Sequence, residues 1–186
     1  TYEGGADGFI PYSSANSTNS TVTGYYIRKF LDENNTNYIN DKSDQYGILM
    51  RYAEVLFILS EAYAEKGDIP TALTYLNKIR TRAGMPNRVT NSKDEYFKYL
   101  EKEKCIEMAF EGQRLDDLKR WRRAKDIING KRAHGVKITK LDDGSFEYQV
   151  VECDDVDRYY PEKYNLIPVP NSEIRNNVKC SQNPLW

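Results

Sequence analysis

Glutamates that recur at every fourth position are the residues most able to do chemistry in this sequence. Glu103, Glu107 and Glu111 lie in the segment Glu101–Trp121, EKEKCIEMAFEGQRLDDLKRW. Glycosidases use two carboxylates as acid and base, and the two must flank a cleft and experience different environments. Here Glu103 and Glu107 project from one face of one predicted helix, and nearby arginines favour the ionised form of both. We therefore expect no acid–base pair at this position.

The same segment supplies cations for these carboxylates. Carboxylates four residues apart on one helix face repel one another unless cations lie close by. Gly112 is expected to break the helix, and basic side chains follow it: Arg114, Lys119, Arg120, Arg122 and Arg123. The segment predicts two helices joined by ion pairs, beside an apolar seam of Leu100, Ile106, Phe110, Leu118 and Trp121. We interpret the run from Arg120 to Arg123 as a salt-bridged or solvated helix face rather than a phosphate clamp.

The residue types that bind metals do not occur at metal-binding spacing. Asp154, Asp155 and Asp157 offer the carboxylate oxygens that calcium prefers. No glycine-punctuated calcium loop surrounds them, so a solvated acidic loop is favoured. His134 is the only histidine, and no cysteine has zinc-ligand spacing. The sequence therefore predicts no metal site and no cofactor.

The thiols allow two interpretations. The three cysteines are Cys105, Cys153 and Cys180. Cys105 lies among apolar residues of a predicted helix and is expected to be a buried thiol. Cys153 and Cys180 lie in loop-rich sequence and could form a disulfide in an oxidising compartment or stay free.

Length and charge restrict the class of protein. A chain of 186 residues can form one good hydrophobic core or part of a larger domain. Its formal net charge of -1 leaves no basic surplus for a nucleic acid or an acidic membrane surface. No apolar run is long enough to span a membrane. We expect neither a nucleic acid partner nor a membrane-spanning segment.

Tyrosine is unusually frequent, at 15 residues against 6 phenylalanines. A tyrosine ring has an apolar face and a hydroxyl group, which suit both half-exposed packing and stacking on sugar rings. The adjacent Tyr159 and Tyr160 are the candidate glycan-contacting residues. Packing of these two rings against the helices is the alternative.

A polar lead-in, residues 1–43, precedes the predicted helices. It is rich in Gly, Ser, Asn and Thr, a composition that does not form a core of its own. Glycosylation sequons occur at Asn16, Asn19 and Asn34, and loop composition alone also explains them. A short extended piece is predicted at 25–30.

Residues 44–130 form the predicted helical core. We expect helices from 44 to Gly67, from Asp68 to Gly84, over about 92–111 and over about 115–129. Asp68 can cap the second helix, and Gly84 with Pro86 can end it. The first helix has two apolar faces and should be buried on both: one is formed by Ile48, Tyr52, Val55, Leu59 and Ala62, the other by Leu49, Ala53 and Leu56.

The last part of the chain has a different pattern. Residues 131–163 are predicted to form a hairpin and a loop, because Val136–Val151 alternates around Asp143-Gly144. Residues 164–186 are predicted to form an extended tail with one helical turn at Ser172–Arg175. Because a free tail would not bury a tryptophan, we expect Trp186 to dock the tail on the helices.

The first helix pair resembles a tetratricopeptide repeat. Small residues at Ser60 and Ala72 allow close approach of two helices, and Gly67-Asp68 lies at the turn between them. The packing positions of that motif are matched by Leu56, Leu59, Ser60, Tyr63, Ala72, Leu76 and Ile79. Because a lone repeat cannot bury its outer face, the third and fourth helices could form a diverged partner pair. The expected fold is mainly α, with antiparallel helix pairs, a β-hairpin insertion and an extended C-terminal tail.

A longer series of segments resembles the C-terminal part of the SusD/RagB family of nutrient-binding outer-membrane lipoproteins. The segments are RYAEVLFILSEAYAEKGD, ALTYLNKIRTRAG, EKCIEMAFEGQRLDDLKRW and IPVPNSEIRNNVKCSQNPLW, in that order, with GYYIRKF upstream. The resemblance covers about residues 24–130 and 164–186. It implies that residues 1–186 are the C-terminal part of a longer domain.

The resemblance also implies a function. A member of this family would be a non-catalytic protein on the outer membrane of a Bacteroidetes-type bacterium, anchored through an N-terminal lipid that this chain does not contain. It would capture an oligosaccharide or another nutrient and pass it to a SusC-like TonB-dependent transporter. The alternative from another class is a free-standing tetratricopeptide-like adaptor that binds a peptide or protein.

The family's sugar-contacting residues cannot be placed on this sequence, but scaffold positions can. The resemblance implies structural ion pairs and packing for a set of side chains in the helices. The set comprises Arg51, Glu54, Arg80, Arg82, Glu103, Glu107, Glu111, Arg114, Asp117 and Trp121.

Overall fold

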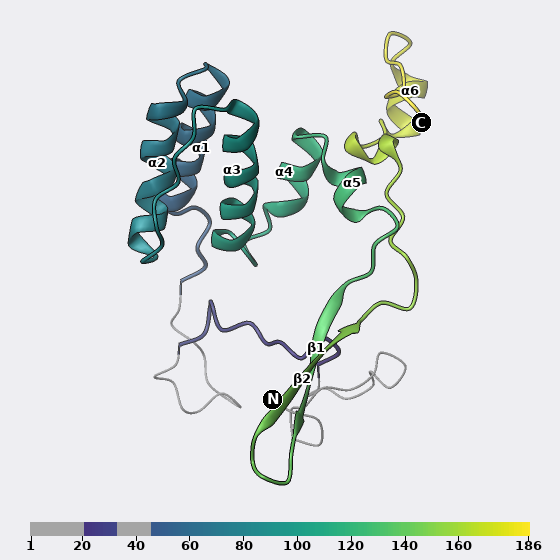
Figure 1. Ribbon diagram of the computed structural model, residues 1–186. Coiled ribbons are helices and arrows are strands. Elements are labelled where there is room, and N and C mark those ends of the chain that lie inside the picture. Colours follow the sequence, from purple (N-terminus) through teal and green to yellow (C-terminus); the bar gives the residue numbers. More distant parts are fainter. Residues whose placement is uncertain (1–20, 33–45) are drawn as a thin grey trace. The chain divides into compact units, whose positions relative to one another are not determined.

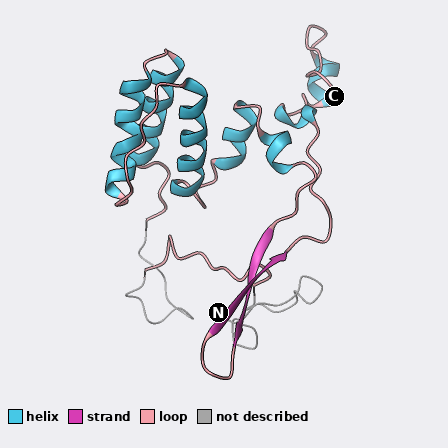
Figure 2. Ribbon diagram, viewed as in Figure 1, coloured by secondary structure: helices cyan, strands magenta, loops and turns pink. Residues whose placement is uncertain are grey.

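The computed structural model describes residues 21–32 and 46–186. The three sequon residues, Asn16, Asn19 and Asn34, lie outside these ranges. The chain divides into two compact units, one of Lys29–Arg114 and one that joins the residues up to Arg28 with Leu115–Trp186. Among the described residues the fold is mainly helical, as predicted (Figures 1 and 2).

The first unit contains three helices that pack side by side (Figure 1). They are α1 (Tyr52–Glu65), α2 (Ile69–Arg82) and α3 (Lys93–Glu107). The α1–α2 pair is joined by a short turn at Gly67, whose positive φ of 88° suits glycine. This pair confirms the tetratricopeptide-like hairpin that the sequence predicts.

Local capping groups explain where these helices begin and end. The Asp68 carboxylate accepts a hydrogen bond from the Thr71 amide at 3.1 Å, and the Ser92 hydroxyl accepts one from the Glu95 amide at 3.3 Å. At the end of α2, Gly84 has a φ of 69°, and the Met85 amide donates to the Arg80 carbonyl at 2.9 Å. The predicted start of the first helix, near residue 44, was too early, since α1 begins at Tyr52.

The core of this unit is organised around a buried polar contact. Ser60, Ala72 and Tyr96 are each fully buried. The Ser60 hydroxyl donates to the Ala72 carbonyl at 2.6 Å and lies 2.5 Å from the Tyr96 hydroxyl. Apolar side chains from the three helices complete the core: Leu56, Phe57, Leu73, Leu76, Ile79 and Leu100.

The prediction that α1 is buried on two faces is wrong for the described residues. Its buried face is formed by Ala53, Leu56, Phe57, Ser60 and Ala64, against α2 and α3. The opposite face is open: the exposed fraction is 68% for Tyr52 and 36% for Leu59. Periodicity identifies the apolar faces of a helix, but whether each is covered depends on neighbouring elements.

Other predictions about the central segment also need correction. The expected fourth helix is two short ones, α4 (Arg114–Arg120) and α5 (Ala124–Ile128), because Arg122 adopts a left-handed φ of 58° between them. Of the predicted apolar seam, Leu100 and Leu118 are buried. Ile106 is 66% exposed because it lies on an uncovered side of α3, and Phe110 is 63% exposed because it follows the end of α3 and adopts a left-handed φ of 66°.

The second unit holds an antiparallel hairpin, drawn in magenta in Figure 2. Its strands are β1 (His134–Lys140) and β2 (Phe146–Glu152), paired from His134↔Glu152 to Lys140↔Phe146. At the predicted turn, Gly144 has a φ of 84° and the Asp143 carboxylate accepts from the Ser145 amide at 2.9 Å.

The stretch that begins at Thr21 runs against strand β1. The Val136 amide donates to the Thr23 carbonyl at 2.9 Å, and the Cys153 thiol donates to the Val22 carbonyl at 3.0 Å. The predicted extended piece at 25–30 forms neither helix nor strand. Cys153 is buried as a free thiol, and Cys105 and Cys180 are also free. The expectation that Cys105 is buried is wrong, because it lies on the exposed side of α3.

Gly24 is the position in this contact that tolerates a side chain least. It has a φ of 72°, and an added Cβ would lie 1.9 Å from the Val136 carbonyl oxygen. We expect Gly24→Ala to detach the 21–24 stretch from β1, because the left-handed conformation alone costs about 1–2 kcal/mol for a residue with a Cβ. Hydrogen exchange of the Val136 amide measures the effect. The matched change Gly144→Ala, where nothing lies within 4 Å, should leave that amide protected.

The C-terminal tail docks on a short 3₁₀ helix, η2 (Glu162–Asn165). The Trp186 indole N–H donates to the carbonyls of Lys163 and Leu166 at 3.0 and 3.1 Å, and its ring stacks on Tyr164 at 5.7 Å. Helix α6 (Asn171–Asn176) contains the predicted turn at Ser172–Arg175. The tail is docked, but Trp186 is 42% exposed rather than buried.

Candidate functional site

The three glutamates predicted to share a helix face are paired with cations from Lys29, α2 and the start of α1. The expectation that the basic side chains after Gly112 would supply these cations is wrong, since Arg114 pairs with Glu101 instead. Glu107 and Glu111 join Lys29, Arg51 and Arg82 in a network that we name the charged cluster. It borders a hollow of about 420 Å³, whose other lining residues include Phe30, Ile48, Ile106 and Phe110. The cluster is thus accessible from solvent while its carboxylates are paired.

Arg51 lies at the centre of the charged cluster. Its Nε donates to the two Glu111 carboxylate oxygens at 3.0 and 2.8 Å, and its Nη1 donates to Glu107 Oε1 at 2.6 Å. Its Nη2 also donates to the Glu107 main-chain carbonyl at 2.6 Å. A planar guanidinium presents donors in several directions at once, and a lysine at this position could not reproduce them.

Lys29 and Arg82 complete the cluster. The Lys29 ammonium donates to the carbonyls of Glu107 and Ala109 at 2.7 and 2.9 Å and also contacts Glu111. Arg82, the last residue of α2, donates to both Glu107 carboxylate oxygens at 2.7 and 2.6 Å. The end of α3 leaves carbonyls without partners inside the helix, and these cations satisfy some of them.

The electrostatics of the cluster oppose acid–base catalysis. Burial raises the pKa of the Glu111 carboxyl, but hydrogen bonds from Arg51 and Lys29 outweigh burial, so the pKa lies below its ordinary value. The hydrogen bond to Glu111 in turn raises the pKa of Arg51. A general acid at neutral pH needs the opposite shift. The cluster joins helix ends, and the lowered pKa of its Glu111 carboxyl does not suit a general acid.

Glu103, on the same helix face, has a different partner. It pairs with Arg80, whose side chain is 5% exposed while that of Glu103 is 13% exposed. Arg80 Nε also donates to the Pro86 carbonyl at 2.7 Å, which ties the loop after α2 to the helix. Glu103 and Glu107 are therefore occupied by separate arginines, and neither is poised opposite the other across a cleft.

The remaining scaffold candidates lie in less connected positions. Arg114 donates to Glu101 at 3.3 Å, and its Nη1 is buried without a partner among the described residues. Asp117 is buried and pairs with Arg120 at 2.9 Å, while the half-buried Trp121 ring lies under the Arg120 guanidinium at 4.7 Å. Glu54 lies in the first turn of α1 and makes no ion pair with another described residue. Arg123 pairs with Asp126 on a helix face.

The two candidate glycan-contacting tyrosines have different environments. Tyr160 is 6% exposed, packs with Leu118 and Ala124, and donates its hydroxyl to the Tyr164 carbonyl at 3.1 Å. Its ring is therefore not available for stacking on a sugar. Tyr159 is 73% exposed and meets Tyr164 edge-on at 6.3 Å.

Arginines form ion pairs with the acidic loop between β2 and η2. Asp154 accepts from the Ala133 amide at 2.7 Å and from Arg158 at 2.9 Å, and Asp157 accepts from Arg132 at 2.7 Å. These contacts lower the pKa of Asp154, with the Ala133 hydrogen bond as the main cause. Within the described ranges, no group of three or more potential metal ligands comes together.

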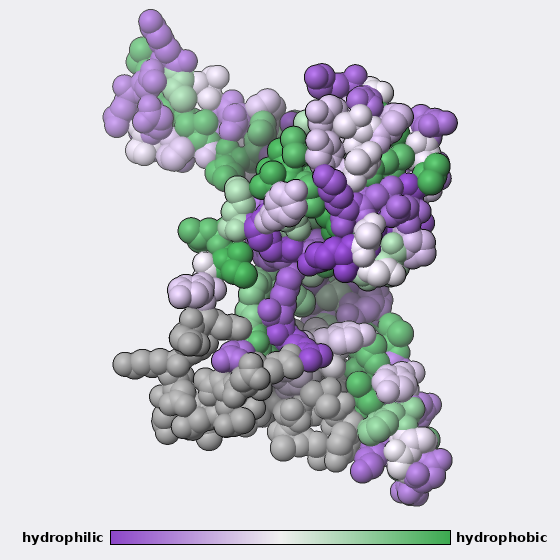
Figure 3. All heavy atoms as spheres, turned by 90° about the vertical axis from the view of Figure 1, so that its left-hand side faces the viewer, coloured by the Kyte–Doolittle hydropathy of each residue, from purple (hydrophilic) through white to green (hydrophobic). Residues whose placement is uncertain are grey.

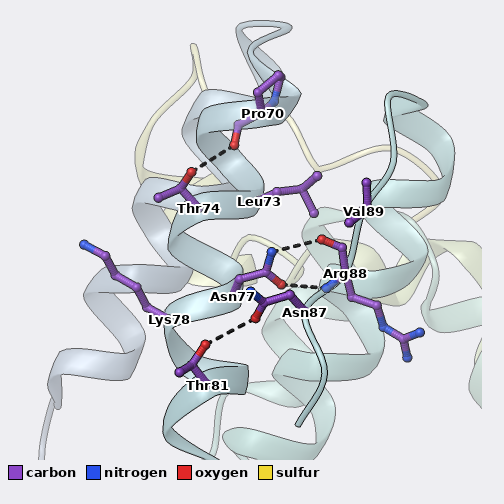
Figure 4. Close-up of a pocket in the computed structure, with 9 residues that line it drawn as sticks. All are labelled: Pro70, Leu73, Thr74, Asn77, Lys78, Thr81, Asn87, Arg88 and Val89. Atoms are coloured by element: carbon purple, nitrogen blue, oxygen red, sulfur yellow. Dashed lines mark hydrogen bonds between the residues drawn. The ribbon is translucent and has the colours of Figure 1, made fainter.

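A shallow groove that the sequence did not predict runs along α2 (Figure 4). We name it the α2 groove. Its volume is about 570 Å³, and it is lined by Pro70, Leu73, Thr74, Asn77, Lys78, Thr81, Asn87, Arg88 and Val89. The Asn77 side chain exchanges two hydrogen bonds with the Arg88 main chain, at 2.9 and 2.8 Å, which fixes the far wall.

Polar side chains at helical spacing are the signal that could have revealed the groove. Thr74, Asn77 and Thr81 recur on one outward face of α2. On the side of the molecule where α2 lies in Figure 1, hydrophilic, intermediate and apolar side chains alternate over the helices (Figure 3).

Comparison with known proteins places this architecture in a family. The model of the SusD family matches residues 2–186, so the chain belongs to the SusD family. It is 28% identical, over 95% of its length, to SusD-like protein P2 of Formosa agariphila. It also resembles the crystal structure of a SusD-like protein from Bacteroides fragilis, with a TM-score of 0.76, 30% identity and 92% of this chain covered.

The matched relatives are much longer than this chain. It covers 32% of the Formosa agariphila protein and 32% of the Bacteroides fragilis chain. Among the described residues, none of the helices combines the length and apolar character needed to cross a bilayer.

Proposed function

We propose that this chain is the C-terminal part of a non-catalytic glycan-binding protein of the bacterial cell surface. In this proposal the intact protein is an outer-membrane lipoprotein that captures an oligosaccharide and delivers it to a SusC-like TonB-dependent transporter. The observation that carries the proposal is the SusD family match over residues 2–186.

The geometry of the first unit supports a binding role without catalysis. Glu103, Glu107 and Glu111 are each paired with a cation, which argues against any of these three carboxyl groups acting as a general acid. Helix ends joined by ion pairs make a rigid surface, and such a surface suits docking on a large partner because little order is lost on binding.

A binding screen tests the proposal. We expect the intact protein to be retarded in native gels that contain one polysaccharide of a panel, and to release no reducing ends from that polysaccharide. In detergent-solubilised outer membranes it should co-purify with a TonB-dependent transporter. Release of sugar from the bound polysaccharide would contradict the non-catalytic role. Retardation by none of the panel would contradict glycan binding itself.

A further inference from the structure

The second unit contains a cavity that neither the family match nor the charged cluster explains. It lies where α5, η2 and the last residues of the tail converge, and we name it the tail pocket. Its volume is about 500 Å³. It is lined by Arg122, Lys125, Asp126, Glu162, Lys163, Asn165, Leu166, Pro184 and Leu185.

The tail pocket is a built cavity, because several contacts fix its walls. The Trp186 indole N–H is bonded to the carbonyls of Lys163 and Leu166, which places Pro184 and Leu185 beside η2. Further along the tail, Gln182 exchanges two hydrogen bonds with the Val169 main chain, at 2.7 and 2.9 Å.

Asn165, a lining residue, has an unused hydrogen-bond acceptor beside this pocket. Its Oδ1 atom is buried and has no partner among the described residues. A buried polar atom without a partner costs about 1–3 kcal/mol, so such atoms in native proteins call for a partner from outside the chain. Because Oδ1 only accepts hydrogen bonds, a rotation of the Asn165 side chain that turns this covered atom toward the pocket would let it accept from a hydroxyl group of a bound molecule.

Two lining residues of the tail pocket have a strained backbone conformation. Arg122 and Leu185 have φ values of 58° and 71°, and both line the pocket. Left-handed conformations at residues other than glycine are uncommon, and they concentrate at ligand-binding sites. With Phe110, these are all the described non-glycine residues that have positive φ.

The charges around the pocket select for a neutral ligand. Three cations, Arg122, Lys125 and Lys163, and two carboxylates, Asp126 and Glu162, line the pocket together. An anionic ligand would meet the carboxylates and a cationic ligand would meet the basic side chains, whereas a hydroxyl group can donate to one and accept from the other. The side chains of Leu166, Pro184 and Leu185 add apolar surface suited to the C–H face of a sugar ring.

We propose that the tail pocket is a subsite for a neutral sugar unit, oriented by a hydroxyl that donates to Asn165 Oδ1. This assignment rests on the proposed glycan-binding function and names where one unit of the ligand is held. Lys125 and Glu162 make no ion pair with another described residue, so both are available to further hydroxyls.

Titration of the intact protein with neutral sugars, followed through the Trp186 indole N–H in ¹⁵N-tryptophan-labelled protein, tests the subsite. The indole is bonded to two carbonyls of the pocket wall, so its resonance should shift when the pocket fills. The probes are glucose, galactose, mannose and xylose, with glucosamine and glucuronic acid as charged comparisons. Trp186→Phe assigns the resonance.

Asn165→Leu should lower the affinity for the neutral sugar by roughly tenfold, because the sugar hydroxyl loses its acceptor. The sugar to use is the one that shifts the indole resonance of the wild type. Asn91→Leu, the same change at an exposed loop position, should leave the affinity unchanged. Lys125→Gln, on the exposed side of α5, serves as a second variant that keeps the fold and should also weaken binding. Thermal unfolding of each variant checks that it is folded.

The outcomes separate this assignment from the function on which it rests. A polysaccharide bound by the intact protein and equally by Asn165→Leu and Lys125→Gln would overturn the subsite and leave glycan binding intact. A shift of the indole resonance that only glucosamine or glucuronic acid produces would overturn the assignment of a neutral ligand. An intact protein that binds none of the polysaccharides or sugars would overturn both proposals.

Discussion

Arg80→Met is expected to destabilise the protein by about 3–5 kcal/mol, because it leaves a carboxylate unpaired in a nearly buried position. Arg80 and Glu103 expose only 5% and 13% of their side chains, and the guanidinium also donates to the Pro86 carbonyl. Urea unfolding followed by circular dichroism measures the change. An unfolding midpoint equal to that of the wild type would contradict a stabilising role for this pair.

Two variants test the cause of that loss. Lys93→Met breaks the Lys93–Glu65 pair, whose side chains are 46% and 59% exposed, and should change stability by less than about 1 kcal/mol. The double variant Arg80→Met/Glu103→Leu should recover much of the loss, because replacement of a buried pair by apolar groups of similar volume is often neutral. If the double variant is as unstable as Arg80→Met, lost packing rather than the unpaired charge is responsible.

Tyr96→Ala is expected to have an effect of similar size, about 3–5 kcal/mol, because it removes the largest fully buried side chain among the described residues. The ring lies in the core of the first unit and its hydroxyl contacts Ser60. Tyr96→Phe keeps the ring and should cost about 1 kcal/mol, the value of one hydrogen bond. Equal losses in the two variants would show that the hydroxyl, not the ring, dominates.

The buried hydroxyl of Tyr96 should also make the stability of the protein depend on pH. Burial raises the pKa of its hydroxyl to about 12, from 10.0, and the hydrogen bond with Ser60 only partly opposes this. A raised pKa in the folded state gives a contribution that is complete below pH 10 and is lost as pH rises towards 12. The wild type should lose about 2–3 kcal/mol relative to Tyr96→Phe over that interval. Parallel pH profiles of the two proteins would contradict this.

Much of the local structure followed from short-range signals in the sequence. Asp68 and Gly84 bound α2 because each acts on main-chain groups within a few residues of itself. Asp143-Gly144 predicted the hairpin for the same reason, since the turn closes on itself through Ser145. Signals of this range need no knowledge of the rest of the fold.

Burial was predicted less well, because it depends on elements distant in the sequence. The apolar pattern of α1 has two faces, and only contact with α2 and α3 decides which is covered. Ile106 and Phe110 fit a helical seam by spacing, yet α3 ends at Glu107 and both side chains are exposed.

The candidate sites show the same division. The spacing of Glu103, Glu107 and Glu111 indicated that cations must lie nearby. It could not show that Arg80 pairs with Glu103, or that Arg51 pairs with both Glu107 and Glu111. Arg51 lies 56 residues from Glu107 in the chain. The tail pocket had no signal in the sequence, because its walls come from α5, η2 and the last residues.

The sequence by itself determined the caps of α2, the hairpin turn, the tetratricopeptide-like pair and the likeness to the SusD family, because these reside in neighbouring residues and in the order of segments. The tertiary structure alone decided which apolar faces are covered, which arginine meets which glutamate, and where the cavities lie. These properties require segments far apart in the chain to converge, and no local pattern specifies that convergence.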